Sequence, residues 1–200
     1  MAAEAWTFLP ERDDLSSLSD EEKIEWLEGR VHRVLIAPLR EMRRFGRGTL
    51  RSPSDDPSAA YWSLAIVTLI CCGIEALGHH LHGRKAVRSG SVRDFEEFID
   101  TFMPDYSSVR EEIYSDFRSG LAHALVPRRG SLDEGLHRPF LRDRRGHLRL
   151  DLDRFFLAFV VAVENYFVAV RESPDMKQRF VDRFATSNRF WIDRPPRGAR

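Results

Sequence analysis

Residues 61–74 read YWSLAIVTLICCGI, an apolar run that ends at Glu75, and residues 155–170 read FFLAFVVAVENYFVAV. A membrane span needs about 20 mostly apolar residues, so both runs are short for one, and the second carries Glu164 and Asn165. Helices at the centre of a water-soluble bundle are apolar on all sides in the same way. The two runs therefore predict two buried helices of a soluble, all-α fold with no membrane span.

Helical spacing and helix start and stop signals extend this fold on both sides of the two runs. Ser19 and Glu22 form a capping box at the start of the first helix, and Pro38 is expected to kink or split that helix. Ser108 and Glu111 form a second capping box. We expect five to six helices, at about residues 20–46, 58–80, 91–103, 108–125, 153–171 and 175–184. In the third, Val92 falls on the apolar stripe and Asp94 on a face that we expect to meet water.

One segment departs from the helical pattern. Leu148, Leu150 and Leu152 alternate with charged residues, which is the period of a strand. Residues 140–142 can pair with it across a turn, so a short β-hairpin is expected within residues 138–152. We divide the chain into an N-terminal extension (1–17), a helical domain (18–185) and an Arg/Pro-rich tail (186–200) that we expect to be disordered.

Composition limits the classes of function. The chain has 200 residues, 42% of them hydrophobic, with 31 basic and 31 acidic side chains, so a core can form and no global field attracts polyanions. The two cysteines, Cys71 and Cys72, are adjacent, which makes an ordinary disulfide and a four-thiolate zinc site unavailable. Residues 1–14 lack the pattern of a signal peptide, so we expect a reducing, cytoplasmic location.

The fourth expected helix carries the residues with the most chemistry. Glu112, Asp116, Ser119 and His123 recur one turn apart, and Ser119 lies within hydrogen-bonding reach of His123. Carboxylates so placed would raise the pKa of His123 and suit it to acid–base work, while Arg118 could hold a phosphate. The same spacing also fits a plain alternative, in which His123 is favoured by the helix dipole and Arg118 is a solvated residue pairing with carboxylates.

The stretch from Arg118 to His123, RSGLAH, fits the pattern R-x(4)-H. It resembles the R-x(4–6)-H signature of the HEPN family (higher eukaryotes and prokaryotes nucleotide-binding domains). Two long helices precede the motif, the aromatic-rich stretch YSDF directly before it fits the same setting, and a loop with Pro127 follows. The resemblance covers residues 18–185 and implies a HEPN-like helical bundle. Ser119 departs from the Asn, Asp or His that often follows the motif arginine in catalytic members.

The resemblance implies a metal-independent endoribonuclease without cofactors, acting in a homodimer that pairs two such sites. The ribose 2′-OH would attack its own phosphate, with His123 as acid or base and Arg118 steadying the phosphate, and DNA would not be cut. Ser119, Asp116 and Glu75 would support the site. A role as a toxin or defence effector, controlled by an antitoxin or another regulatory protein, is part of the same expectation.

Further candidates lie outside the motif. Glu75 interrupts an apolar helix and needs a partner, which could be Arg118, His123 or an arginine of the first helix. His79, His80 and His82 suggest zinc, but we interpret them as a polar helix end and expect no metal. Residues 128–149 hold seven arginines and three acidic residues, a patch that could guide RNA or simply be solvated. We assign RNA binding to Arg128, Arg129, Arg144 and Arg145.

Two other functions remain open at this point. The chain could be a HEPN-like module without catalysis that binds RNA, a nucleotide or a protein partner. It could also be a helical interaction protein in which the R-x(4)-H spacing is accidental.

Overall fold

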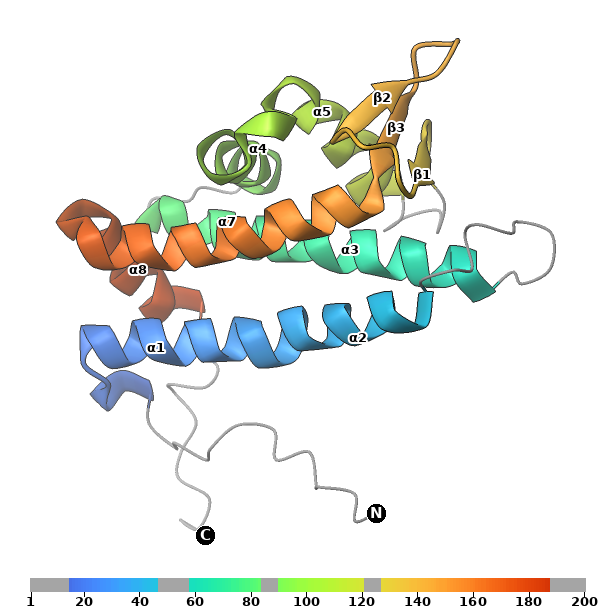
Figure 1. Ribbon diagram of the computed structural model, residues 1–200. Coiled ribbons are helices and arrows are strands. Elements are labelled where there is room, and N and C mark those ends of the chain that lie inside the picture. The colour runs from blue at the N-terminus through green and yellow to red at the C-terminus, as the bar shows by residue number, and fades with distance from the viewer. Residues whose placement is uncertain (1–14, 47–57, 84–89, 121–126, 188–200) are drawn as a thin grey trace, which may run out of the picture.

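The fold is a layered helical bundle with a small sheet at one end (Figure 1). The computed structural model describes residues 15–46, 58–83, 90–120 and 127–187. Helices α1 (Asp20–Val31) and α2 (Ala37–Gly46) form one layer, and α3 (Ser58–Gly78), α7 (Leu152–Glu172) and α8 (Pro174–Ser187) form the middle. Helix α4 (Gly90–Phe102), the short α5 (Arg110–Glu112) and the sheet cover the other side. The expected all-α bundle with a β insertion is confirmed.

The first layer is a rod whose interruption has a specific form. The predicted capping box is present: the Ser19 hydroxyl accepts from the Glu22 amide at 3.3 Å, and the Glu22 carboxylate accepts from the Ser19 amide at 2.9 Å. Before Pro38 the chain forms a π-helical turn, His32–Ile36, and the amide of Ala37 donates to the carbonyl of His32. Because proline has no amide hydrogen, the ladder of i→i−4 bonds is broken there, and the wider turn absorbs the defect.

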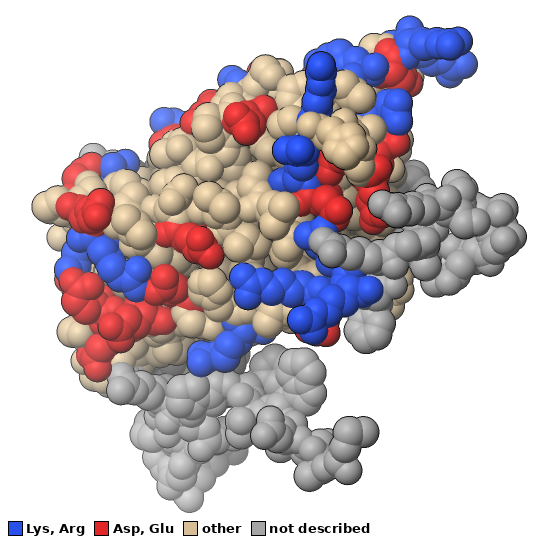
Figure 2. Space-filling view, in the orientation of Figure 1, with Lys and Arg blue, Asp and Glu red and all other residues tan. Residues whose placement is uncertain are grey.

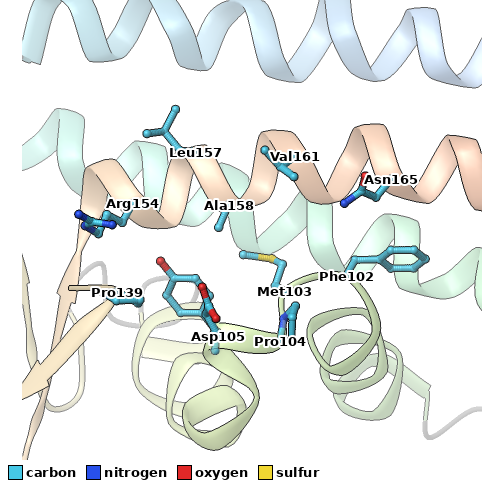
Figure 3. A pocket seen from close by; sticks show the side chains of 11 residues that line it. Phe102, Met103, Pro104, Asp105, Pro139, Arg154, Leu157, Ala158, Val161 and Asn165 are labelled. Carbon is cyan, nitrogen blue, oxygen red and sulfur yellow. The ribbon is translucent and has the colours of Figure 1, made fainter. Parts of the chain in front are cut away.

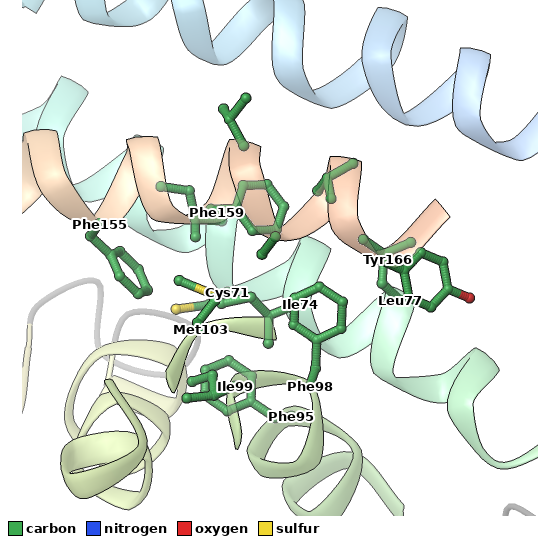
Figure 4. Close-up of a cluster of buried hydrophobic side chains, with 14 of the residues drawn as sticks. Cys71, Ile74, Leu77, Phe95, Phe98, Ile99, Met103, Phe155, Phe159 and Tyr166 are labelled. Carbon is green, nitrogen blue, oxygen red and sulfur yellow. The ribbon is translucent and has the colours of Figure 1, made fainter. Parts of the chain in front are cut away.

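Helices α3, α4 and α7 supply most of the core (Figure 4). Figure 4 shows Cys71 and Ile74 of α3, Phe98 of α4 and Phe159 of α7 meeting in this cluster. Gly78 sets the approach of α3 to α4, because a Cβ at this position would lie 2.2 Å from the carbonyl oxygen of Asp94. Only glycine fits so close to another backbone, which fixes how these two helices pack.

One stretch of the described helices, Trp62–Leu81, has the length and apolar composition of a membrane span. In its most apolar window, however, 56% of the residues are buried inside the fold. A core helix of a bundle passes the same test by composition, so this stretch is weak support for a membrane location.

The sheet confirms the expected hairpin and adds a strand. Strands β2 (Phe140–Arg142) and β3 (Leu148–Asp151) are antiparallel, with Leu141 opposite Arg149. Strand β1 (Ser131–Asp133), which the sequence reasoning missed, pairs parallel to β3 and gives the order β1-β3-β2. Asp151 then caps α7, since its carboxylate accepts from the Arg154 amide at 2.9 Å and from the Leu136 amide at 2.7 Å.

Three local expectations are wrong. Asp94 does not face water: it is 1% exposed, because α4 turns this carboxylate toward His79 and His82 at the end of α3. Val92, placed on the apolar stripe, is exposed instead. Ser108 does not cap a helix either, because it lies within a 3-10 helix, Pro104–Val109, and α5 begins after it without a side-chain cap.

Candidate functional site

The helix that carries the motif is not a regular α-helix. After the single turn of α5, residues Ile113–Arg118 form a π-helix, and the amide of Ser119 donates to the carbonyl of Tyr114, five residues back. Ile113 and Phe117 face the core. π-Helical turns inside helices are frequent at functional sites, because the wider turn places side chains where a regular helix would not.

Arg118 is held by an acidic partner from a neighbouring helix. Its Nε donates to Glu75 Oε2 at 2.8 Å, and its Nη2 lies 2.7 Å from the same oxygen. The side chains are 26% and 14% exposed, so the pair is largely withdrawn from water while part of the guanidinium stays accessible. Burial opposes the charged form of Arg118, but the hydrogen bond and charge of Glu75 outweigh it and raise the pKa of the guanidinium. The structure thus brings together two of the predicted site residues.

Tyr114 is a third member of this cluster, and the sequence reasoning did not single it out. The Arg118 guanidinium carbon lies 5.5 Å from the centre of the Tyr114 ring, within the range of a cation–π contact. The Tyr114 hydroxyl is 3.1 Å from the hydroxyl of Ser91, and its ring meets Phe95 edge-on. The signal available in the sequence was the i, i+4 spacing of Tyr114 and Arg118 on one helix.

Asp116 belongs to a different side of the same helix. Burial raises the pKa of its carboxyl, and the charges nearby are those of Arg129, Glu112 and His147, the first and last of which lower it. Arg129 and His147 come from the chain that leads into and through the sheet, not from α3. The surroundings of Asp116 therefore differ from those of Arg118, which contacts Glu75 of α3.

His123 lies outside the described residues, and Ser119 is half-buried just before that gap. Beyond residues 121–126, the amide of Arg128 donates to the carbonyl of Asp116 at 3.0 Å. The chain on the far side of the gap is therefore attached to the motif helix one turn before Ser119. The geometry between His123 and Arg118 stays a prediction from sequence spacing.

The four predicted RNA-binding arginines are all exposed: Arg128, Arg129, Arg144 and Arg145. None of the four guanidinium groups forms an ion pair with a carboxylate in the described part of the chain. Figure 2 shows basic side chains over the β2–β3 hairpin and along α2, whereas acidic ones gather over α1. Exposed, unpaired arginines keep their charge available for a polyanion.

Arg142 links this basic hairpin to the motif helix. Its two terminal nitrogens donate to the two carboxylate oxygens of Glu112 at 2.8 and 2.6 Å. A bidentate contact of this kind fixes direction as well as distance. The hairpin is thereby held against the helix that carries Arg118.

Within the described ranges, the other nucleophilic and metal-ligating side chains do not form a second centre. His79 and His82 lie against Asp94, with His82 Nε2 at 3.2 Å from Asp94 Oδ1 and 3.1 Å from Glu97 Oε2. Among the described residues, no group of three or more His, Cys, Asp or Glu side chains is arranged to hold a metal ion. Cys71 is buried, and burial raises the pKa of its thiol, which makes it a poor nucleophile.

No family model matches this chain, and no curated protein or solved structure matches it.

Proposed function

We propose that this protein is a HEPN-like, metal-independent endoribonuclease. The observation that carries the proposal is the arrangement of Arg118: a partly exposed guanidinium, fixed by Glu75 and Tyr114 on a π-helical turn, five positions before His123. A side chain fixed in this way is preorganised to meet charge, so little reorganisation is needed when a phosphate arrives. The exposed arginines of the hairpin support the same substrate, an RNA backbone.

The reaction would be a transesterification within the RNA. The ribose 2′-oxygen loses its proton to a base, attacks the adjacent phosphorus and forms a 2′,3′-cyclic phosphate. The 5′-oxygen of the next nucleotide leaves and takes a proton from an acid. His123 would serve as one of these groups, with Ser119 orienting it, and Arg118 would balance the negative charge that grows on the phosphoryl oxygens.

A homodimer would complete the site, because one chain offers a single His123 and this step uses both an acid and a base. Two copies related by a two-fold axis present two histidines and two arginines across one interface. A regulatory protein that covers this interface, such as an antitoxin, would silence the enzyme.

One observation favours a second function, a HEPN-like module that binds RNA without cutting it. Glu75 occupies both the Nε and the Nη2 of Arg118, so its negative charge offsets the positive charge that a transition state would need. In that case Arg118 would contribute to RNA binding alone.

A matched pair of substrates separates the two functions. We would compare an RNA oligonucleotide with the same sequence carrying 2′-deoxyribose throughout, in excess chelator. The endoribonuclease cuts only the RNA, and Arg118→Ala abolishes cutting, whereas Arg93→Ala, an exposed arginine on α4, leaves it unchanged. RNA binding without scission, at protein concentrations that form a dimer, would refute the enzyme and leave the binding module.

A further inference from the structure

A groove on the surface of the bundle has the features of a ligand site. It lies between α7 on one side and the corner that joins α4 to the 3-10 helix Pro104–Val109 on the other, and its volume is about 390 Å³ (Figure 3). Small-molecule sites in proteins run from about 300 to 1,000 Å³. The groove therefore suits a small ligand.

Most of the wall is apolar, and part of it is left open to water. Figure 3 shows Leu157 and Val161 of α7 beside the groove, with Met103 opposite. Leu157 is 56% and Val161 52% exposed, and both lie on the one α7 face that lines the groove. Large apolar side chains that are exposed side by side in a groove are one mark of a binding surface.

Two hydrogen-bond donors line the groove, the buried Tyr106 and the exposed Arg154. Tyr106 is 1% exposed, it lines the groove, and its hydroxyl has no hydrogen-bond partner within the described part of the chain. Arg154 lines the same groove and forms no ion pair with a described carboxylate. The Arg154 charge is among those that act on the Tyr106 phenol, after the charges of Asp151 and Asp105.

A buried donor without a partner costs free energy, so such groups are normally satisfied by water or by a ligand. Burial also raises the pKa of Tyr106, and Asp151 and Asp105 reinforce the effect, so the phenol keeps its proton and acts as a donor. A neutral hydroxyl donor next to an unpaired guanidinium is a good match for an oxyanion, since both contacts are charge-assisted.

We propose that the groove binds a small amphipathic carboxylate, with its head on Arg154 and Tyr106 and its apolar tail along Met103, Leu157 and Val161. Two carboxylates also act on Tyr106, and both would repel the head group. Asp105 lines the groove and is exposed, so water screens it. Asp151 is buried, and its charge is offset in part by the amides of Leu136 and Arg154, which donate to its two oxygens. This site is independent of the proposed nuclease function.

The test uses three probes of eight carbons each that differ in their heads: octanoate, 1-octanol and octylammonium. Binding to the full chain is measured by calorimetry, with heteronuclear NMR shifts to locate each probe. The variants are Tyr106→Phe, which keeps the buried ring, and Arg154→Gln, with Arg93→Gln as an exposed control on α4. Melting curves check that each variant is folded.

We expect octanoate to bind at least tenfold more tightly than either other probe. Arg154→Gln should weaken octanoate about tenfold and Tyr106→Phe about fivefold, because one charge-assisted contact and one hydrogen bond are lost. Arg93→Gln should change nothing. The proposal would be overturned if millimolar octanoate showed no saturable binding, or if the three probes bound equally tightly. Tightest binding of octylammonium, or unchanged octanoate binding in both groove variants, would also overturn it.

Discussion

Replacing Glu75 with glutamine removes one charge from the contact that holds Arg118 and leaves the shape of the side chain almost unchanged. Two nitrogens of Arg118 converge on one Glu75 oxygen at 2.8 and 2.7 Å. After the substitution an amide faces the guanidinium, and a mostly buried cation loses its counter-charge. Tyr114 remains as the other contact of the guanidinium.

Two known magnitudes bound the expected loss in the free energy of unfolding. Breaking a fully buried pair by removing one partner costs about 3–5 kcal/mol, and a charge-assisted hydrogen bond contributes about 1.5–3 kcal/mol. Since the Arg118 side chain is still 26% exposed, the pair is not fully buried, and we expect Glu75→Gln to lower the free energy of unfolding by about 2 kcal/mol. For a chain of this size that corresponds to about 4–8 °C in Tm.

The assay is urea unfolding of a double-mutant cycle with Glu75→Gln and Arg118→Gln. The account predicts a coupling of about 1–2 kcal/mol between the two sites. Glu41→Gln, which disturbs the exposed pair between Glu41 and Arg44 on α2, is the control and should cost less than about 0.5 kcal/mol. Additive effects in the cycle, or a loss no larger than that of the control, would refute the claim that Glu75 holds Arg118 in place.

Three further substitutions test helix packing and the burial of a histidine. Gly78→Ala should lower the free energy of unfolding by about 3 kcal/mol or more, because the added Cβ would lie 2.2 Å from a backbone oxygen of Asp94. Gly29→Ala, in an uncrowded helix position, should instead stabilise by up to about 1 kcal/mol, and equal effects in thermal melts would contradict this packing. Burial lowers the pKa of His80 to about 4, so the unfolded chain takes up a proton first and stability falls as pH drops from about 6.5 to 4, by about 3 kcal/mol in all. In urea titrations across this pH range, His80→Leu should lose that part of the pH dependence, and an unchanged slope would show that His80 is not buried as a neutral ring.

Local sequence signals predicted the elements well where the deciding contacts are short in range. The capping box at Ser19, the long apolar helix α7 and the hairpin of β2 with β3 each depend on neighbours a few positions away. Hydrophobic period and capping chemistry contain that information directly.

Contacts between distant segments account for what the sequence did not predict. Asp94 has the spacing of a solvated residue, yet it is buried because His79 and His82 reach it from another helix. Strand β1 forms because it pairs with β3. Gly130 allows this close approach, since a Cβ there would lie 2.3 Å from the carbonyl oxygen of Leu148, but the sequence alone does not show which segment approaches it.

The candidate site was predicted in its residues more than in its geometry. Glu75 was expected to need a partner, and Arg118, 43 positions away, was one of three options. The π-helical turn at Ile113–Arg118 was not foreseen, because the stripe argument assumed 100° per residue throughout. In the structure, Arg118 contacts Glu75 of α3, whereas Asp116 lies near Arg129 and His147.

The proposed nuclease is tested most directly by end-group analysis of RNA incubated in excess chelator with wild type and with His123→Ala from identical preparations. The account predicts 2′,3′-cyclic phosphate and 5′-hydroxyl ends from wild type alone. Equal cleavage by both proteins, or products with other ends, would contradict it.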